Sequence, residues 1–192
     1  MTILISGFVP FGEWKSNPTE RLVEELESDN INTILLPVSY DRAFKELENT
    51  ADILRPDTLI MLGVAGRRKC ISLERIAINV IDAEIKDNDG YGLNGLVIEE
   101  SGPDGIFTNM DLLKIYETYD QSRFLPLEIS NTAGTYVCNY LYYRALSKYK
   151  NSMNVLFIHV PPTKDEMAES EIIFDDLKES VRSIIKNFSS TK

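Results

Sequence analysis

Apolar runs alternate with helical patterns along the chain, and this alternation constrains the fold more than any other feature of the sequence. The first half holds three short apolar runs separated by two helix-like stretches: runs at 2–6, 32–37 and 58–63, and helices at 18–28 and 41–54. Asn17 and Pro18 mark the first helix start, because Asn caps helix ends and Pro fits the first helical position. Strands and helices that alternate in this way predict a mostly parallel sheet with helices on both faces.

The second half continues the pattern with more irregular connections. Residues 71–83 have β character, and residues 90–109, with five of the ten glycines, predict an irregular stretch. The remaining elements follow in order: a helix at 110–119, a strand at 127–130, a helix to about 150, a strand at 154–159, a helix at 164–186 and a frayed tail to 192. With no repeat and no linker-like change in composition, we expect one α/β domain over residues 1–192, with a twisted, mostly parallel or mixed sheet.

Charge and cysteine content exclude several classes of function. The chain has 20 Lys and Arg and 30 Asp and Glu, and a net charge of −10 argues against nucleic acid and anionic membrane as partners. No apolar run approaches the roughly 18 residues that span a bilayer, and residues 1–8 lack the basic start of a signal peptide. Two cysteines without a CxxC spacing form neither a disulfide framework nor a zinc site, so we expect a reducing, cytoplasmic setting and no metal.

Cys138 is the first candidate for chemistry. A short β-like run ends at Ser130, Ala133 and Gly134 follow, and a helical pattern then places Cys138 in the first turns of a helix. Free amides at a helix start lower the pKa of a thiol and can bind a developing oxyanion. The alternative is that Cys138 is a small buried hydrophobe, as most cysteines in soluble proteins are. Nothing around the other cysteine, Cys70, suggests chemistry.

His159 and Glu74 complete a possible set of catalytic groups. His159 is the only histidine and ends an apolar strand, at the kind of edge where α/β sheets carry their sites. Cys138 lies just past the end of another strand, so both side chains could face one edge. A thiolate, an imidazole and a carboxylate such as Glu74 are what nucleophilic cysteine catalysis requires. The alternatives are a structural histidine and an ion pair between Glu74 and Arg75.

Four blocks of the sequence, in order, resemble the pyroglutamyl peptidase type I family, also called pyrrolidone carboxyl peptidase. The blocks are Ser6-Gly7-Phe8 with Pro10-Phe11-Gly12 and Asn17-Pro18-Thr19; Glu74 to Asn79 with Asp82-Ala83; Ala133 to Asn139; and Phe157 to Pro161. The resemblance implies a phosphorylase/hydrolase-like fold and a cysteine-type omega peptidase that acts on N-terminal pyroglutamyl peptides. It also implies a homo-oligomer, commonly a tetramer and otherwise a dimer, with no cofactor.

The resemblance also assigns roles to individual residues. It makes Cys138 the nucleophile, His159 the general base and acid, and Glu74 the carboxylate that orients the imidazole. Six further positions match those that line or adjoin the pocket for the substrate's lactam ring: Phe8, Phe11, Asn17, Ile85, Tyr136 and Val137. An apolar slot suits a small, uncharged ring with few polar groups to satisfy.

The chain departs from the family pattern at four positions. Glu13 replaces a usual Gly, Val64 replaces the Gln of many members, Glu84 replaces an Arg, and Pro162 replaces an aromatic residue. Two alternative functions therefore stay open: a cysteine hydrolase of another small cyclic amide or acyl compound, and a non-catalytic binding or structural protein on the same scaffold.

Overall fold

The protein is built around one six-stranded sheet. The structure is a computed structural model that describes residues 1–28 and 30–189. The strands lie in the order β2 (Ile31–Leu36), β1 (Ile3–Phe8), β3 (Thr58–Val64), β8 (Asn154–Val160), β4 (Ile71–Glu74) and β7 (Leu127–Ser130). A separate antiparallel pair joins β5 (Ile76–Ile78) to β6 (Gly105–Phe107). The helices are α1 (Pro18–Leu26), α2 (Ala43–Leu54), α3 (Leu112–Thr118), α4 (Val137–Tyr149) and α5 (Phe174–Ser189).

The sheet is mixed, with two groups of strands that run in opposite directions. Strands β2, β1, β3 and β8 are parallel to one another. Strands β4 and β7 are parallel to each other, and β4 pairs antiparallel with β8. The expected α/β class with a mostly parallel, mixed sheet is therefore confirmed.

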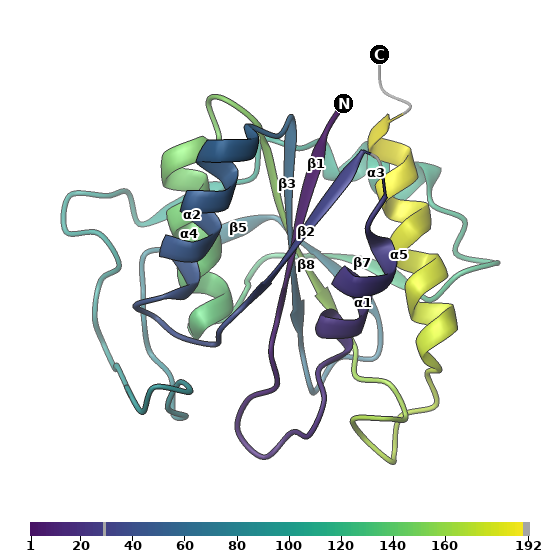
Figure 1. The fold of residues 1–192 in the computed structure, drawn as a ribbon, viewed down its shortest axis with the longest axis horizontal. Helices are drawn as coiled ribbons and strands as arrows, with labels where there is room; N and C mark the ends of the chain where they lie inside the picture. The colour runs from purple at the N-terminus through teal and green to yellow at the C-terminus, as the bar shows by residue number, and fades with distance from the viewer. Residues whose placement is uncertain (29, 190–192) are drawn as a thin grey trace.

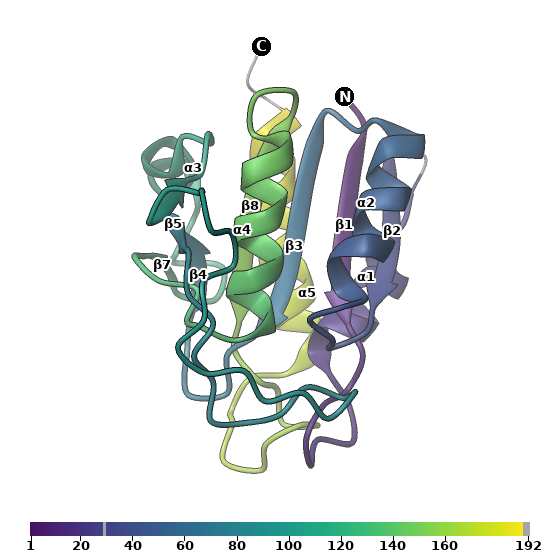
Figure 2. The same cartoon turned by 90° about the vertical axis from the view of Figure 1, so that its left-hand side faces the viewer.

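Helices cover both faces of the sheet. Figures 1 and 2 show α2 and α4 on one face and α1 and α5 on the other. Alternate side chains of β8 divide between the two cores: Val155 and Phe157 pack with α2 and α4, and Leu156 and Ile158 pack with α1, α3 and α5. Because both faces are covered, the central strands are buried along nearly their whole length, which explains their continuous apolar runs.

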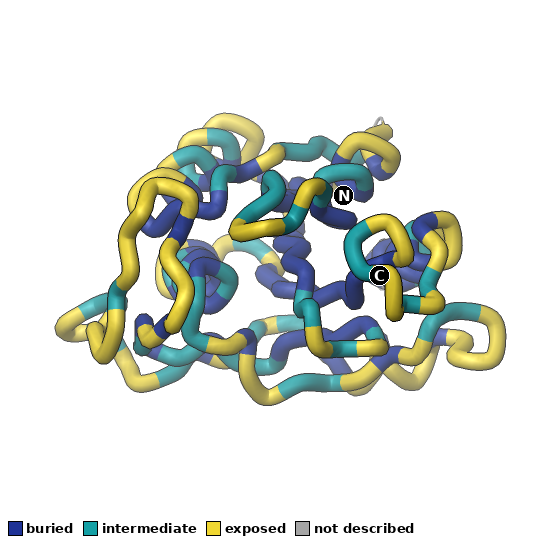
Figure 3. Tube along the Cα trace, turned by 90° about the horizontal axis from the view of Figure 1, so that it is seen from below, coloured by how far each residue is buried: buried dark blue, intermediate teal, exposed yellow. Residues whose placement is uncertain are grey.

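The loops that follow β1, β3 and β8 meet at the carboxyl edge of these parallel strands. This edge lies at the bottom of Figure 1, and Figure 3 views the molecule from that side, with exposed loops around a buried centre. The loop after β8 contacts both the loop after β1 and helix α1: Ser16 Oγ of the loop donates to Glu166 Oε1 at 2.9 Å, and Arg21 of α1 pairs with Asp165 at 2.6 Å.

The last helix begins ten residues later than the sequence pattern predicts. Residues 163–173 form turns instead of the expected first turns of a helix from 164. The Glu166 carboxylate accepts from Thr163 N at 3.0 Å, and Lys164 N donates to Ile172 O at 2.9 Å. These contacts, with those to Ser16 and Arg21, stabilise the non-helical path. Helix α5 continues to Ser189, and residues 190–192 of the expected frayed tail lie outside the described residues.

Two smaller differences concern the middle of the chain. The β-like stretch 71–83 divides into β4 and β5 at Arg75, and an isolated bridge pairs Ile81 with Leu96. The expected irregular stretch 90–109 contains β6, which pairs with β5 and packs beside α4. This small ribbon therefore supports the first turns of the helix that carries Cys138.

Candidate active site

Helix α4 delivers Cys138 to the face of the sheet. Gly134 has a φ of +80°, which favours glycine, in the turn that leads from β7 to α4. Cys138 is the second residue of the helix. Two hydrogen bonds link the next residue, Asn139, to β5: its Oδ1 accepts from Ile78 N at 3.0 Å, and its Nδ2 donates to Ile78 O at 2.9 Å. The first turn of α4 is thus fixed by buried polar contacts as well as by packing.

Glu74 and His159 meet on the same face of the sheet. The register between β4 and β8 sets Ser72 opposite His159, and Glu74 lies two residues further along β4. His159 Nδ1 is 2.7 Å from Glu74 Oε1, and the two side chains are 6% and 0% exposed. A carboxylate at Nδ1 fixes the orientation of an imidazole and leaves Nε2 for proton transfer.

The Cys138 sulfur lies beside this pair. Gly63 of β3 is the register partner of His159 in β8. A Cβ atom added to Gly63 would lie 3.0 Å from Cys138 Sγ and 2.8 Å from the Phe157 ring. The thiol therefore sits over β3 next to the histidine, so the structure brings Cys138, His159 and Glu74 together from three distant parts of the chain.

Arg68 joins this group although sequence reasoning did not select it. Its Nη1 is 2.6 Å from Glu74 Oε1, and its Nη2 donates to Thr132 O at 3.0 Å. The expected alternative partner of Glu74 was Arg75, but the ion pair forms with Arg68. The available signal was the position of Arg68 on the loop directly after β3, at the edge where α/β sheets carry sites.

The thiol is less acidic than the helix-start position suggested. Burial, and to a smaller extent the nearby Glu74 carboxylate, raise the pKa of the Cys138 thiol to about 12. The Cys138 backbone amide and Arg68 lower the pKa, but their effect is smaller than that of burial. The expected net lowering was therefore wrong, because loss of water around the sulfur outweighs the helix-start amides. At neutral pH the resting group is a thiol, so attack on a substrate requires a base.

A small, mostly apolar pocket opens at Cys138. It is lined by Phe8, Phe11, Asn17, Val38, Val64, Tyr136, Val137 and Cys138. Five of the six predicted substrate-contact positions are among them. Ile85 is not, and its side chain is 52% exposed on a neighbouring loop. Val38 was missed by sequence reasoning; its signal was an apolar residue just after the carboxyl end of β2.

Asn17 shapes the pocket through the backbone. Its Oδ1 accepts from Thr19 N at 3.0 Å and so caps α1, and its Nδ2 donates to Val9 O at 3.2 Å. The side chain is almost completely buried. The cap function considered from the sequence is confirmed, and the same bonds hold the loop between β1 and α1 in place.

Aromatic rings and backbone contacts build the pocket walls. Phe11 stacks on Trp14 at a centroid distance of 5.8 Å and lies 6.2 Å from the Tyr136 ring. The Tyr136 hydroxyl donates to Lys86 O at 2.9 Å, and Asn88 Nδ2 donates to Pro10 O at 2.9 Å. The segment around residues 86–88 therefore connects both walls. Glu84, which precedes this segment, is exposed.

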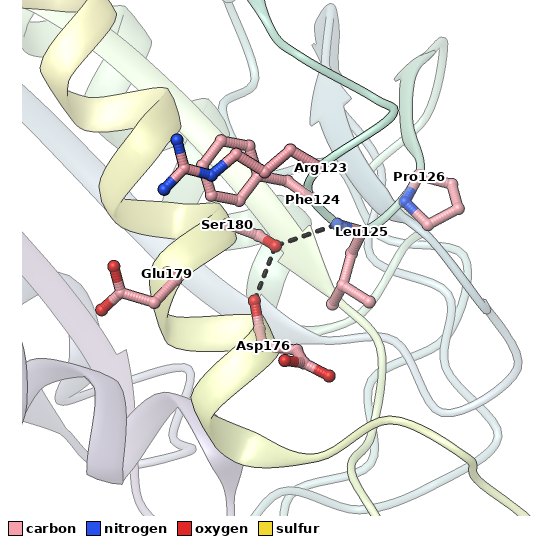
Figure 4. A pocket seen from close by; sticks show the side chains of 7 residues that line it. All are labelled: Arg123, Phe124, Leu125, Pro126, Asp176, Glu179 and Ser180. Atoms are coloured by element: carbon pink, nitrogen blue, oxygen red, sulfur yellow. Dashed lines mark hydrogen bonds between the residues drawn. The ribbon is translucent and has the colours of Figure 1, made fainter.

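A larger hollow elsewhere has no comparable chemistry. It lies between residues 123–126 and α5 (Figure 4), where Leu125 N donates to Ser180 Oγ at 3.0 Å and Ser180 Oγ donates to Asp176 O at 2.6 Å. Its seven lining residues include neither cysteine nor histidine. Within residues 1–28 and 30–189, no cluster of three or more Cys, His, Asp or Glu is arranged to hold a metal. In the same residues, no helix is both long and apolar enough to cross a membrane.

Comparisons with known proteins agree on one family. The family model described as pyroglutamyl peptidase matches residues 1–181. The pyrrolidone-carboxylate peptidase of Pyrococcus furiosus is 38% identical over 177 residues, which cover 88% of this chain and 85% of that protein. The protein of the same name from Thermosipho melanesiensis is 34% identical over the full length of both chains.

Solved structures give the same result. The structure of pyroglutamyl peptidase I from Bacillus amyloliquefaciens superposes with a TM-score of 0.91 at 28% identity and covers 98% of this chain and 95% of its own. The pyrrolidone carboxyl peptidase of Thermococcus litoralis superposes with a TM-score of 0.88 at 32% identity. The match covers 97% of this chain and 92% of that chain.

Proposed function

Because the chain belongs to the pyroglutamyl peptidase family, we propose that it is a cysteine peptidase that removes an N-terminal pyroglutamyl residue from peptides. The observation that carries the proposal is the grouping of Cys138, His159 and Glu74 beside a small apolar pocket. The reaction is hydrolysis of the amide bond that follows the pyroglutamyl ring.

In the proposed mechanism His159 Nε2 takes the proton of the Cys138 thiol as the sulfur attacks the substrate carbonyl. Glu74 at Nδ1 holds the imidazole and stabilises its protonated form. The imidazolium then protonates the leaving amine, and water hydrolyses the thioester. A resting thiol with a pKa of about 12 makes this proton transfer necessary at neutral pH.

The start of α4 supplies donors for the oxyanion. The first backbone N–H groups of a helix have no partner within the helix, and they carry partial positive charge. In α4 these belong to Val137, Cys138 and Asn139, next to the attacking sulfur. Donors fixed in advance stabilise the charge that develops in the tetrahedral intermediate.

The pocket supports a preference for the lactam ring. Phe8, Phe11, Val38, Val64 and Val137 supply apolar walls. The polar atoms of Asn17 are already used by Thr19 and Val9, so the pocket has little capacity for a charged group. A pyroglutamyl ring has no ammonium group and fits this environment better than an ordinary N-terminus.

The deciding experiment is hydrolysis of pyroglutamyl-aminocoumarin by the wild type, Cys138→Ser and Cys70→Ser. We expect turnover by the wild type, loss of turnover in Cys138→Ser and nearly unchanged turnover in Cys70→Ser. The control is apt because Cys70 is the other free cysteine and lies away from the pocket residues. Activity in Cys138→Ser together with its loss in Cys70→Ser would reverse the assignment of the nucleophile.

Val64 favours testing a second substrate class. It lines the pocket with an apolar side chain where many family members have Gln. A panel of N-acyl aminocoumarins with other small cyclic amides tests whether the ring is selected. Equal turnover across the panel would indicate a broader cyclic-amide hydrolase, and no turnover of any member would indicate a binding protein.

The setting and assembly of the enzyme are part of the same proposal. Two free cysteines agree with a reducing cytoplasm. Family resemblance supports a homo-oligomer, a tetramer or a dimer, built from one domain per chain over residues 1–192. Light scattering during size-exclusion chromatography measures the oligomer, and a monomer at all concentrations would contradict it.

A further inference from the structure

One arginine connects the two segments that carry the proposed catalytic groups. Arg68 lies on the loop between β3 and β4, and its guanidinium is 2.6 Å from Glu74 Oε1 on β4. Its second arm donates to Thr132 O at 3.0 Å and to Ser130 Oγ at 3.3 Å. These two acceptors lie at the start of the segment that leads into α4 and Cys138.

The Glu74 carboxylate depends on few partners. Its side chain is 0% exposed, and Oε1 contacts both His159 Nδ1 and Arg68 Nη1. Among the described residues Oε2 has no hydrogen-bond partner. A buried carboxylate is costly unless a charge and hydrogen bonds compensate it. Arg68 supplies a permanent positive charge 2.6 Å from Oε1, and this contact holds the carboxylate in a fixed position beside the imidazole.

The second nitrogen of the Arg68 guanidinium, Nη2, holds the chain segment that leads into α4 and Cys138. Ser130 Oγ also donates to Thr132 O at 3.1 Å, so the guanidinium joins an already ordered turn. Gly134, with its positive φ, and the first turn of α4 follow directly. A shift of this turn would therefore move the thiol relative to the histidine.

We propose that Arg68 is a positioning residue that sets the Glu74–His159 pair in register with Cys138. This inference rests on the proposed function and deepens it. Arg68 acts through Glu74 and the 130–132 turn. Its planar fork bonds both in fixed directions, which a lysine cannot do.

Arg67 provides a matched control. It precedes Arg68 and carries the same charge, but its side chain is exposed, whereas the Arg68 side chain is 24% exposed. A general effect of lost positive charge on this loop would be the same for both residues. An effect on the geometry of the site would be seen at Arg68 alone.

The first test compares turnover of Arg68→Met, Arg68→Lys and Arg67→Met on pyroglutamyl-aminocoumarin, per folded molecule. We expect kcat of Arg68→Met to fall on the order of a hundredfold, as small displacements of reacting groups do, with KM changed by less than about threefold. Arg68→Lys should fall between wild type and Arg68→Met, and Arg67→Met should match the wild type. Wild-type kcat in folded Arg68→Met, or in Arg68→Lys, would overturn the proposal.

The second test needs no substrate. Arg68 lowers the pKa of the Cys138 thiol, and only the thiolate reacts with iodoacetamide. In a Cys70→Ser background, alkylation at fixed alkaline pH should be slower in Arg68→Met than in Arg67→Met, and Arg68→Lys should keep most of the rate. Equal rates in the two Met variants would contradict the proposed placement of Arg68. If the wild type fails to cleave pyroglutamyl substrates, the proposed function fails, and this assay still decides the arrangement around the thiol.

Discussion

At the scale of single residues, the Cys138 thiol is the group whose behaviour differs most from that of a free side chain. Burial and the Glu74 carboxylate raise its pKa to about 12, above an ordinary value of 9.0. Because alkylation requires the thiolate, the rate with iodoacetamide should keep rising with pH through the alkaline range. The measurement is the pH-rate profile of Cys70→Ser, which retains Cys138 as its one thiol. An alkylation rate that stops rising below pH 8, on the order of four pH units under the expected pKa of about 12, would contradict this.

The His159–Glu74 pair should show unequal losses. His159→Ala removes both the base and the acid, so kcat should fall at least about a thousandfold. Glu74→Gln keeps the shape of the side chain at Nδ1 but loses its charge, so its loss should be smaller. Saturation kinetics on both variants, with circular dichroism as the check of folding, gives the comparison. An equal or larger loss in folded Glu74→Gln would show that Glu74 does more than orient the ring.

Removal of the hydroxyl group from two buried tyrosines should change the free energy of unfolding in opposite directions. Among the described residues the buried Tyr40 hydroxyl has no hydrogen-bond partner, whereas the hydroxyl of Tyr142, which is buried more completely, donates to Glu74 O at 2.9 Å. Tyr40→Phe should therefore raise the free energy of unfolding by about 1 kcal/mol, and Tyr142→Phe should lower it by about as much. Urea unfolding of the two variants measures the difference. If both substitutions change the free energy of unfolding in the same direction, the hydrogen-bond partners of the hydroxyl groups do not decide their effects on stability.

The sequence predicted residue types at the site better than it predicted their partners. Cys138, His159 and Glu74 could be selected because a thiol at a helix start and an imidazole at a strand end are recognisable patterns. The structure brings them together, and their catalytic roles stay predictions. Arg68 and Val38 had weaker signals, because their importance arises only in the folded chain: Arg68 bonds Thr132, which is 64 positions away, and Val38 lines the same pocket as Cys138, which is 100 positions away.

At the scale of elements, the contact between β3 and α4 decides where the sulfur lies. A Cβ on Gly63 would meet the Phe157 ring at 2.8 Å and Cys138 Sγ at 3.0 Å. Gly63→Ala should therefore cost about 1–3 kcal/mol of stability and reduce kcat on the order of a hundredfold. Gly92→Ala is the control, since its Cβ would meet only a flexible lysine side chain at 3.4 Å. Full activity in Gly63→Ala would show that α4 can move away from β3 without effect on the thiol.

Element positions were predictable, but strand directions needed an argument about loop length. The sequence predicts Cys138 and His159 at the same edge of the sheet, on the assumption that the strand before Cys138 and the strand that carries His159 are parallel. In fact β7 and β4 run against β8. Residues 65–70 are too few for a parallel crossover, which takes a dozen or more residues. The late start of α5 was less accessible, because it depends on contacts of Asp165 and Glu166 with residues 144 and 150 positions earlier.

At the scale of the whole molecule, exposed ion pairs connect distant segments and should make stability depend on acid. Asp52 of α2 bonds Lys148 and Tyr149 of α4, and these bonds lower the pKa of Asp52 below 3.8. A lowered folded pKa contributes stability above the unfolded value, and that stability is lost as pH falls through the folded value.

The unfolding midpoint of Asp52→Asn should therefore lie below that of the wild type at neutral pH, and the difference should shrink below about pH 4. Urea titrations from pH 7 to pH 2, an acid range that covers the Asp52 transition, give the comparison. Glu24→Gln, at an exposed position on α1, serves as the control. A constant difference at every pH would show that the Asp52 charge is not the cause.

The ends of the sheet and of α5 have a practical meaning. Strand β1 begins and α5 ends on the side of the molecule opposite the loops that surround the pocket (Figure 1). A solid support or a fused carrier protein attached near the start of β1 or the end of α5 would therefore face away from the pocket opening, and a peptide in solution would still reach the thiol. Immobilised molecules oriented in this way would act as a reusable reagent for unblocking peptides before sequencing.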